Sequence, residues 1–146
     1  MTELQHILCI RKEENKMKVK FTYLSDDGKM WSTPLCEVVD DERYDENCAT
    51  YLPLSVAELY YISWIDEELS EIERVEKGEI ECHETGTDIF FVDVYKDRVE
   101  FKDVFQEWPD WSCTPEEYKR VLLGQRTFLM LPKEPESYLE IKVNDL

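Results

Sequence analysis

The chain has 146 residues, 42% of them hydrophobic and 12% aromatic, which suffices for the core of one domain over residues 1–146 and is too little for two. Its formal net charge of −17 argues against nucleic acid or an anionic membrane as a ligand, because both are bound through Lys and Arg. The alternative explanation of the charge is that it serves only solubility.

Cysteine usage and the start of the chain bear on the compartment. Five cysteines, an odd number with no two separated by two residues, fit neither a disulfide framework nor a zinc ribbon. No charged-then-apolar leader opens the chain, and no apolar run approaches the roughly 18–20 residues that span a bilayer. These features predict a cytoplasmic protein with free thiols.

The first elements expected along the chain are strands. A short apolar run over 6–11 predicts one. In 17–24 the residues alternate strictly, with Val19, Phe21 and Tyr23 on one face, as in a half-buried antiparallel strand. The turn residues "SDDGK" that follow predict a hairpin.

A loop and a long helix come next. Residues 36–50 carry six carboxylates without a useful period and predict a surface loop, entered at most by a short strand at 38–39. Apolar residues then recur every three or four positions over 52–78, which predicts a long helix. Ser55 and Glu58 match a capping box at its start. Its length leaves room for a break near the middle.

The clearest β signal follows the helix. Alternation in 79–84 predicts a strand, and 88–95 and 98–105 flank the two residues "KD" as a tight hairpin. Residues 106–113, with two Trp around a Pro and an Asp, predict a loop.

The last helix has the strongest local signals. Thr114 is a suitable N-cap, Pro115 suits the first helical position and Glu117 completes a capping box. Pro132 ends the element, and alternation over 138–143 predicts a closing strand. The face expected to be buried consists of Tyr118, Val121, Leu122, Gln125, Phe128 and Leu129.

This order of elements predicts an α+β fold. We expect one mainly antiparallel sheet of about six strands, with two amphipathic helices packed on it.

Signals for catalysis are weak. The glycines are scattered singly, so there is no phosphate loop, and Gly124 is read as close packing against the sheet, with a ligand groove as the alternative. His6 and His83 are the only histidines, and His83 reads as a surface residue beside a core Cys82. Asp93 interrupts an apolar strand and is expected on the solvated face. We therefore expect no enzyme, no cofactor and no metal.

Binding signals are stronger. The segment 40–47 places a tyrosine among carboxylates but lacks the glycine that a calcium loop needs. Exposed acids steer basic partners, and aromatic residues are enriched at interface hot spots. The alternative is a solvated helix face and tryptophans that cover the core. The predicted partner-binding residues are Asp40, Asp41, Glu42, Tyr44, Asp45, Glu46, Glu67, Glu71, Trp108, Asp110 and Trp111.

The hairpin "DIFFVDVYKDRVEFKDVF" followed by the helix "TPEEYKRVLLGQRTFLMLP" resembles the C-terminal half of some bacterial immunity proteins, over residues 79–132. This resemblance implies a small, cytoplasmic binding protein that neutralises the toxin of a polymorphic-toxin or contact-dependent inhibition system. With the acidic charge, it leads us to expect a basic toxin, with a nuclease as first candidate, occluded at its active site or an adjacent surface. The alternative is a small enzyme or ligand-binding domain with a pocket between sheet and helices that uses Cys82, His83 or Asp93.

Overall fold

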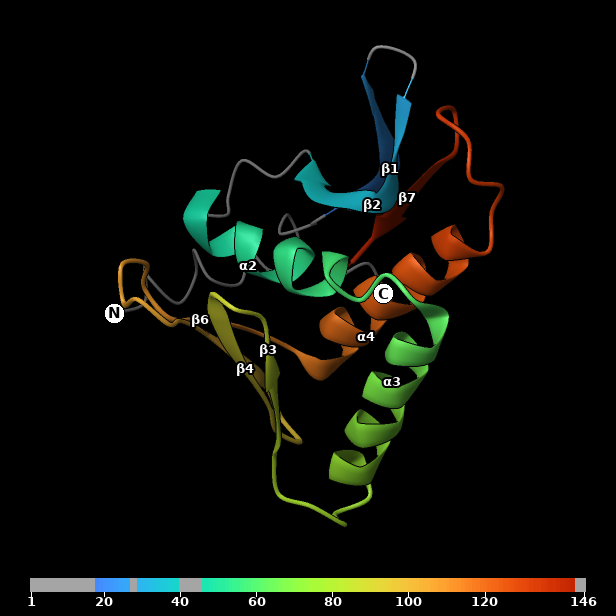
Figure 1. Ribbon diagram of the computed structural model, residues 1–146. Coiled ribbons are helices and arrows are strands. Elements are labelled where there is room, and N and C mark those ends of the chain that lie inside the picture. Colours follow the sequence, from blue (N-terminus) through green and yellow to red (C-terminus); the bar gives the residue numbers. More distant parts are fainter. Residues whose placement is uncertain (1–17, 27–28, 40–45, 144–146) are drawn as a thin grey trace, which may run out of the picture.

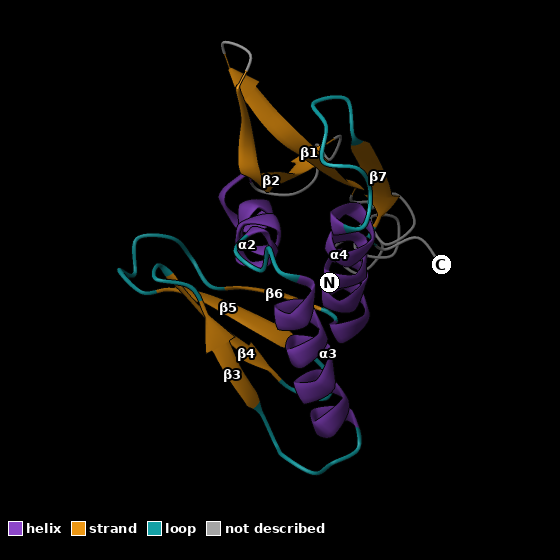
Figure 2. Cartoon of the chain, turned by 45° about the vertical axis from the view of Figure 1, so that its right-hand side comes forward, coloured by secondary structure: helices purple, strands orange, loops and turns teal. Residues whose placement is uncertain are grey.

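The computed structural model describes residues 18–26, 29–39 and 46–143 of the chain. Within these residues the protein forms two antiparallel sheets and three helices (Figures 1 and 2). In chain order the elements are β1 (Lys18–Asp26), β2 (Lys29–Val39), α2 (Glu46–Ala57), α3 (Ile62–Glu76), β3 (His83–Gly86), β4 (Phe90–Val94), β5 (Val99–Asp103), β6 (Trp111–Cys113), α4 (Pro115–Leu129) and β7 (Tyr138–Lys142).

The helices lie between and beside the two sheets. One sheet has the strand order β2-β1-β7 and the other the order β3-β4-β5-β6. Figure 1 shows α2 and α4 between the sheets, and α3 contacts α4 and β3. One continuous cluster of buried apolar side chains includes residues of both sheets and all three helices.

The α+β class and the antiparallel pairing are confirmed, but the prediction of one sheet of about six strands with two helices was wrong. The closing strand β7 pairs with β1, where Val19 faces Ile141 and Phe21 faces Leu139. It therefore completes the N-terminal sheet and leaves β3 to β6 as a separate four-stranded meander. Pairing between strands so distant in sequence leaves no local signal.

Locally encoded elements formed as expected. In β1, Val19 and Phe21 are fully buried. The β4–β5 hairpin closes around Lys96 and Asp97 as predicted, because Tyr95 N–H donates to the carbonyl of Arg98 at 2.8 Å.

Helix α4 has the expected N-terminus and buried face. The Glu117 backbone N–H donates to Thr114 Oγ1 (3.1 Å), and the Thr114 N–H donates to Glu117 Oε1 (2.8 Å). Gly124 packs closely on the sheet, since an added Cβ would lie 2.8 Å from Ile141 Cδ1 and 2.9 Å from the Phe21 ring. The packing interpretation of this glycine therefore holds.

The single long helix over 52–78 was wrong, because α2 ends at Ala57 and α3 begins at Ile62. The helix is interrupted before Ile62, because the backbone of Tyr61 is extended (φ −117°, ψ 136°). The two halves bury different faces: α2 packs between the sheets, whereas α3 packs on α4 and β3. One straight helix cannot do both, and the predicted capping box fails because α2 begins well before Ser55.

Two predicted loops contain regular structure. The segment 36–50 is divided between β2, which extends to Val39, and α2, which begins at Glu46. Within 106–113, the end forms β6 and pairs with β5. The strand expected over 79–84 is shifted, since β3 begins only at His83. The strand expected over 6–11 lies outside the described residues.

Two further features concern membranes and thiols. In the described ranges, no helix has both the length and the apolar character needed to cross a membrane. Cys82 is a half-buried free thiol, and Cys113 is a buried one.

Candidate partner-binding site

Most of the predicted acidic loop lies outside the described residues, namely Asp40, Asp41, Glu42, Tyr44 and Asp45. Glu46 is the first residue of α2, and its side chain is not among the described ones. The involvement of this loop in binding therefore stays a prediction.

The two predicted acids of α3 differ in their surroundings. Glu67 is exposed. Glu71 is half-buried, accepts hydrogen bonds from Arg74 Nη1 at 3.3 and 3.4 Å, and lies 3.9 Å from His83 Nδ1. Glu71 thus faces other parts of the protein as well as solvent.

Other acids of α3 form ion pairs with α4. Asp66 pairs with Arg126 at 2.7 Å, and Glu76 pairs with Lys119 at 2.6 Å. Surface pairs of this kind contribute little to stability, because solvent screens their charges. Part of the negative charge of this segment is therefore paired with basic side chains of α4.

The predicted tryptophans pack on the core. Trp108 lies 5.6 Å from the Tyr51 ring and 5.7 Å from the Phe90 ring, measured between centroids. Trp111 is half-buried in β6, and with the exposed Asp110 it lines a shallow hollow of about 440 Å³ on the four-stranded sheet. Trp108, Asp110 and Trp111 thus lie around the four-stranded sheet, whereas Glu67 and Glu71 belong to α3.

A buried carboxylate, which the sequence did not reveal, links three elements. Glu68 of α3 lies 2.7 Å from His83 Nε2 in β3 and accepts a 2.6 Å hydrogen bond from the Tyr118 hydroxyl in α4. Burial, followed by the Glu68 charge, raises the pKa of Tyr118 well above its usual value. The hydrogen bond to Glu68 raises the pKa of His83 despite partial burial. The expected surface position of His83 was wrong, because its ring faces α3.

The other residues considered for catalysis, Asp93 and Cys82, lie among carboxylates of the four-stranded sheet. Asp93 faces Glu84 on one side and Glu100 on the other across the sheet, so three carboxylates form a row. Burial, followed by the charge of Asp93, raises the pKa of Cys82, which keeps this thiol protonated and weakly nucleophilic. Among the described residues, no group of three or more His, Cys, Asp or Glu side chains could hold a metal ion.

An exposed aromatic cluster, Tyr60, Tyr61 and Trp64, lies where α2 turns into α3. Their ring centroids are 4.6 to 5.2 Å apart. Each side chain is between 39 and 55% exposed, far above the exposure of the core aromatics. Large aromatic side chains that remain exposed together are typical of binding surfaces.

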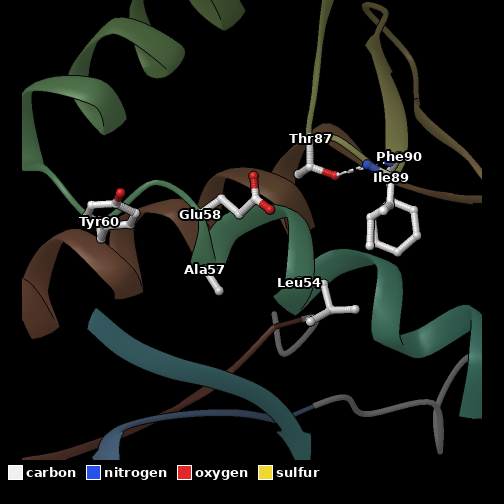
Figure 3. Close-up of a pocket in the computed structure, with 7 residues that line it drawn as sticks. All are labelled: Leu54, Ala57, Glu58, Tyr60, Thr87, Ile89 and Phe90. Atoms are coloured by element: carbon white, nitrogen blue, oxygen red, sulfur yellow. Dashed lines mark hydrogen bonds between the residues drawn. The ribbon is translucent and has the colours of Figure 1, made fainter. Parts of the chain in front are cut away.

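A two-lobed cleft lies beside this cluster, between α2 and the turn that joins β3 to β4. Figure 3 shows its outer lobe, of about 250 Å³, with Leu54 and Tyr60 on the helix side and Ile89 on the turn. The inner lobe, of about 200 Å³, reaches Trp64. Both lobes are lined by Glu58 and Thr87, so the aromatic cluster forms part of the rim of the cleft.

Glu58 is the carboxylate of the cleft, as Figure 3 shows. Partial burial, followed by the charge of Asp88, raises the pKa of its carboxyl group. No described basic side chain forms an ion pair with Glu58, in contrast to Asp66 and Glu76 of α3. The site thus contains a negative charge that its surroundings disfavour.

The turn over the cleft is held in place by local hydrogen bonds. Thr87 Oγ1 accepts from the backbone N–H groups of Ile89 (3.1 Å) and Phe90 (3.0 Å). Gly86 has φ +149°, and a Cβ there would lie 2.3 Å from the Phe90 carbonyl oxygen. Only glycine therefore fits this position, and the turn is a fixed wall of the cleft.

The inner lobe also has an unsatisfied polar group. The Ser55 side chain lines this lobe, and its buried hydroxyl has no hydrogen-bond partner among the described residues. A buried polar atom without a partner is unfavourable by about 1–3 kcal/mol. Such an atom beside a cavity indicates a place where a polar ligand group would be stabilised.

Sequence reasoning missed the whole cleft. The one local signal was "YYISW", three aromatics within five residues next to acidic segments. Its aromatics were interpreted as parts of one continuous helix, and the contribution of the β3–β4 turn depends on tertiary packing.

Comparison of the chain with protein-family models, with curated proteins and with solved structures gave no match.

Proposed function

We propose that this protein is a non-catalytic, acidic binding protein of the cytoplasm that neutralises a basic protein toxin, with a nuclease as first candidate. The observation that carries the proposal is the exposed aromatic cluster beside the cleft, in which Glu58 has no cationic partner among the described residues. The net charge of −17 and the resemblance of residues 79–132 to immunity proteins support it.

In the proposed mechanism, charge accelerates association and aromatic contacts slow dissociation. The acidic surface attracts a basic partner and accelerates association, an effect that salt weakens. Tyr60, Tyr61 and Trp64 then supply the desolvated centre of the interface and slow dissociation. A nuclease holds its phosphates in a cationic cleft, so an acidic protein that covers this cleft or a neighbouring surface excludes the substrate.

The experiment is affinity capture with the full chain from a lysate of the source organism, at about 0.15 and 0.5 M salt. We expect one basic protein to be retained at both concentrations, and its toxic activity to be inhibited at equimolar ratio. A retained protein whose activity is unchanged would contradict the proposal. So would a mixture of basic proteins that all dissociate at the higher salt.

A matched pair of variants tests the aromatic cluster in the same assay. Tyr61 is 55% exposed and Tyr138 of β7 is 53% exposed, so Tyr61→Ala and Tyr138→Ala remove equally accessible rings from different surfaces. We expect Tyr61→Ala to weaken partner binding by about 2 kcal/mol, roughly thirty-fold, and Tyr138→Ala to leave it unchanged. Equal effects would place the interface elsewhere.

The acidic loop before α2 is included in the proposed interface as the steering element. Charge reversal to Lys at Asp40, Asp41, Asp45 and Glu46 is expected to lower the association rate about ten-fold at low salt. Stopped-flow or surface-based kinetics would measure this rate. An association rate equal to that of the wild type would remove the loop from the interface.

A ligand-binding domain is the second candidate, and the inner lobe favours it, since the Ser55 hydroxyl there has no hydrogen-bond partner in the described ranges. This site lies between a sheet and helices, but it does not include Cys82, His83 or Asp93. Denaturing the natively purified protein and analysing the released compounds by mass spectrometry tests this candidate. One compound released in stoichiometric amount would support it, and a protein that releases none would favour the toxin inhibitor.

A further inference from the structure

We propose that the cleft between α2 and the β3–β4 turn receives one arginine side chain of the basic partner, with Glu58 as its counter-ion. This inference rests on the proposed function and specifies the central contact of that interface. It assigns to Glu58, Ser55 and Trp64 the recognition of a guanidinium group.

Charge is the first argument. Glu58 and Asp88 repel each other, and no described basic side chain forms an ion pair with Glu58. Partial burial adds to the unfavourable position of the Glu58 charge. A cation brought by a partner would relieve both effects, so the free protein is prepared for a positive group and disfavours a negative one.

The walls of the cleft favour arginine over lysine. Trp64 lines the inner lobe and Tyr60 the outer lobe, and a planar guanidinium stacks on aromatic rings while it binds a carboxylate through two parallel hydrogen bonds. The Ser55 hydroxyl, which has no partner among the described residues, can accept one of the remaining N–H groups. Leu54 and Ile89 provide apolar surface for the methylene groups of the side chain.

The size of the cleft is compatible with a side chain as its occupant. The lobes measure about 250 and 200 Å³. Together they lie at the lower end of the roughly 300–1,000 Å³ typical of ligand pockets. Because Glu58 lines both lobes, a guanidinium in either lobe remains next to the carboxylate.

The test is an NMR titration of the full chain with n-butylguanidinium, compared with n-butylurea, its uncharged analogue of similar shape, and with n-butylammonium. We expect saturable shifts of the Thr87, Ile89 and Phe90 amides and of the Trp64 indole, with a dissociation constant in the millimolar range. Butylammonium should bind more weakly, and butylurea about ten-fold more weakly or not measurably.

Two isosteric variants provide the control. Glu58→Gln should weaken butylguanidinium binding about ten-fold, whereas Glu136→Gln, at an exposed acid between α4 and β7, should not change it. Equal binding of butylurea, shifts spread evenly over the acidic surface, or an unchanged affinity of Glu58→Gln would overturn the inference.

This titration requires no toxin, so the two proposals can fail separately. If butylguanidinium binds at the cleft but no basic toxin is captured, the cation site is supported and the proposed function is contradicted. If a toxin is captured and Tyr61→Ala weakens its binding, but Glu58→Gln binds it as well as the wild type, only the arginine site is contradicted.

Discussion

Glu58, in the turn that follows α2, and Glu68 of α3 have opposite surroundings. Glu68 is buried and shares its two oxygens between His83 and Tyr118. Glu58 is exposed beside a cleft, next to Asp88, and has no described cationic partner. A carboxylate with satisfied hydrogen bonds, such as Glu68, supports the fold. Glu58 lies beside a cavity and lacks a described cationic partner, which is why we propose it as the binding residue.

The same contrast holds for the aromatic residues. Tyr51 is fully buried in contact with Phe90 and Trp108, and it contributes to the core. Tyr61 and Trp64 contact each other but remain exposed. In each case the surrounding contacts, not the residue type, separate a structural role from a proposed binding role.

The largest expected effect comes from removing the buried carboxylate. Glu68→Ala would leave the Tyr118 hydroxyl buried without a partner and His83 without its counter-charge, so we expect a loss of about 3 kcal/mol in the free energy of unfolding. Urea denaturation would measure it. The exposed neighbour Glu67 provides the control, because Glu67→Ala should change stability by no more than about 0.5 kcal/mol. A similar small change in both variants would mean that the network does not stabilise the fold.

The next effect concerns packing beneath α4. Gly124→Ala would place a Cβ against Phe21 and Ile141, and we expect a net loss of about 1–2 kcal/mol even though Ala favours a helix by about 1 kcal/mol over Gly. Thr127→Ala, at an exposed position of the same helix, should leave stability unchanged or slightly raise it. If Gly124→Ala stabilised the protein, the side chains of Phe21 and Ile141 would have to move aside at little cost in free energy.

The change of stability with pH that His83 causes should be smaller than the effects of these two substitutions. The His83 pKa is raised in the folded protein by Glu68, with a further contribution from Glu71, while the Tyr118 hydroxyl faces the same carboxylate from α4. Stability from protonated His83 is therefore fully present below its unfolded pKa of about 6.5 and is lost as pH rises through the raised folded pKa. The difference in unfolding free energy between the wild type and His83→Gln should be greater at about pH 6 than at about pH 9. A difference independent of pH would exclude this ionic contribution.

The smallest expected effect on stability is that of Glu58→Gln. Because this substitution removes a charge that lies next to Asp88 and pairs with no described basic residue, the free energy of unfolding should stay within about 0.5 kcal/mol of the wild type or rise slightly. Thermal and urea denaturation at neutral pH would measure this difference. A marked loss of stability would mean that Glu58, like Glu68, has a structural role, and the contrast between the two residues would disappear.

Sequence patterns a few residues long correctly predicted the elements that local interactions stabilise. The alternation around Phe21 predicted β1. The capping-box residues Thr114 and Glu117 predicted the start of α4, and their reciprocal hydrogen bonds confirm it. Two turn residues predicted the β4–β5 hairpin. In each case the interacting groups are close in sequence, so the composition of one short segment was sufficient.

The cleft could be predicted only in part. The aromatic sequence "YYISW" was visible, and so was the acidity around it, but no local pattern separates Glu58 from Glu68, since both lie in segments that continue helical spacing. The inward position of His83 depends equally on the packing of β3 against α3.

Local patterns were enough to predict an acidic α+β protein, the alternation of β1, the β4–β5 hairpin and the capped start of α4. The division into two sheets, the helix break before Ile62 and the hydrogen bonds of Glu68 could not be predicted in this way. They depend on contacts between segments far apart in the chain, and no short stretch of sequence contains the free energies of those contacts.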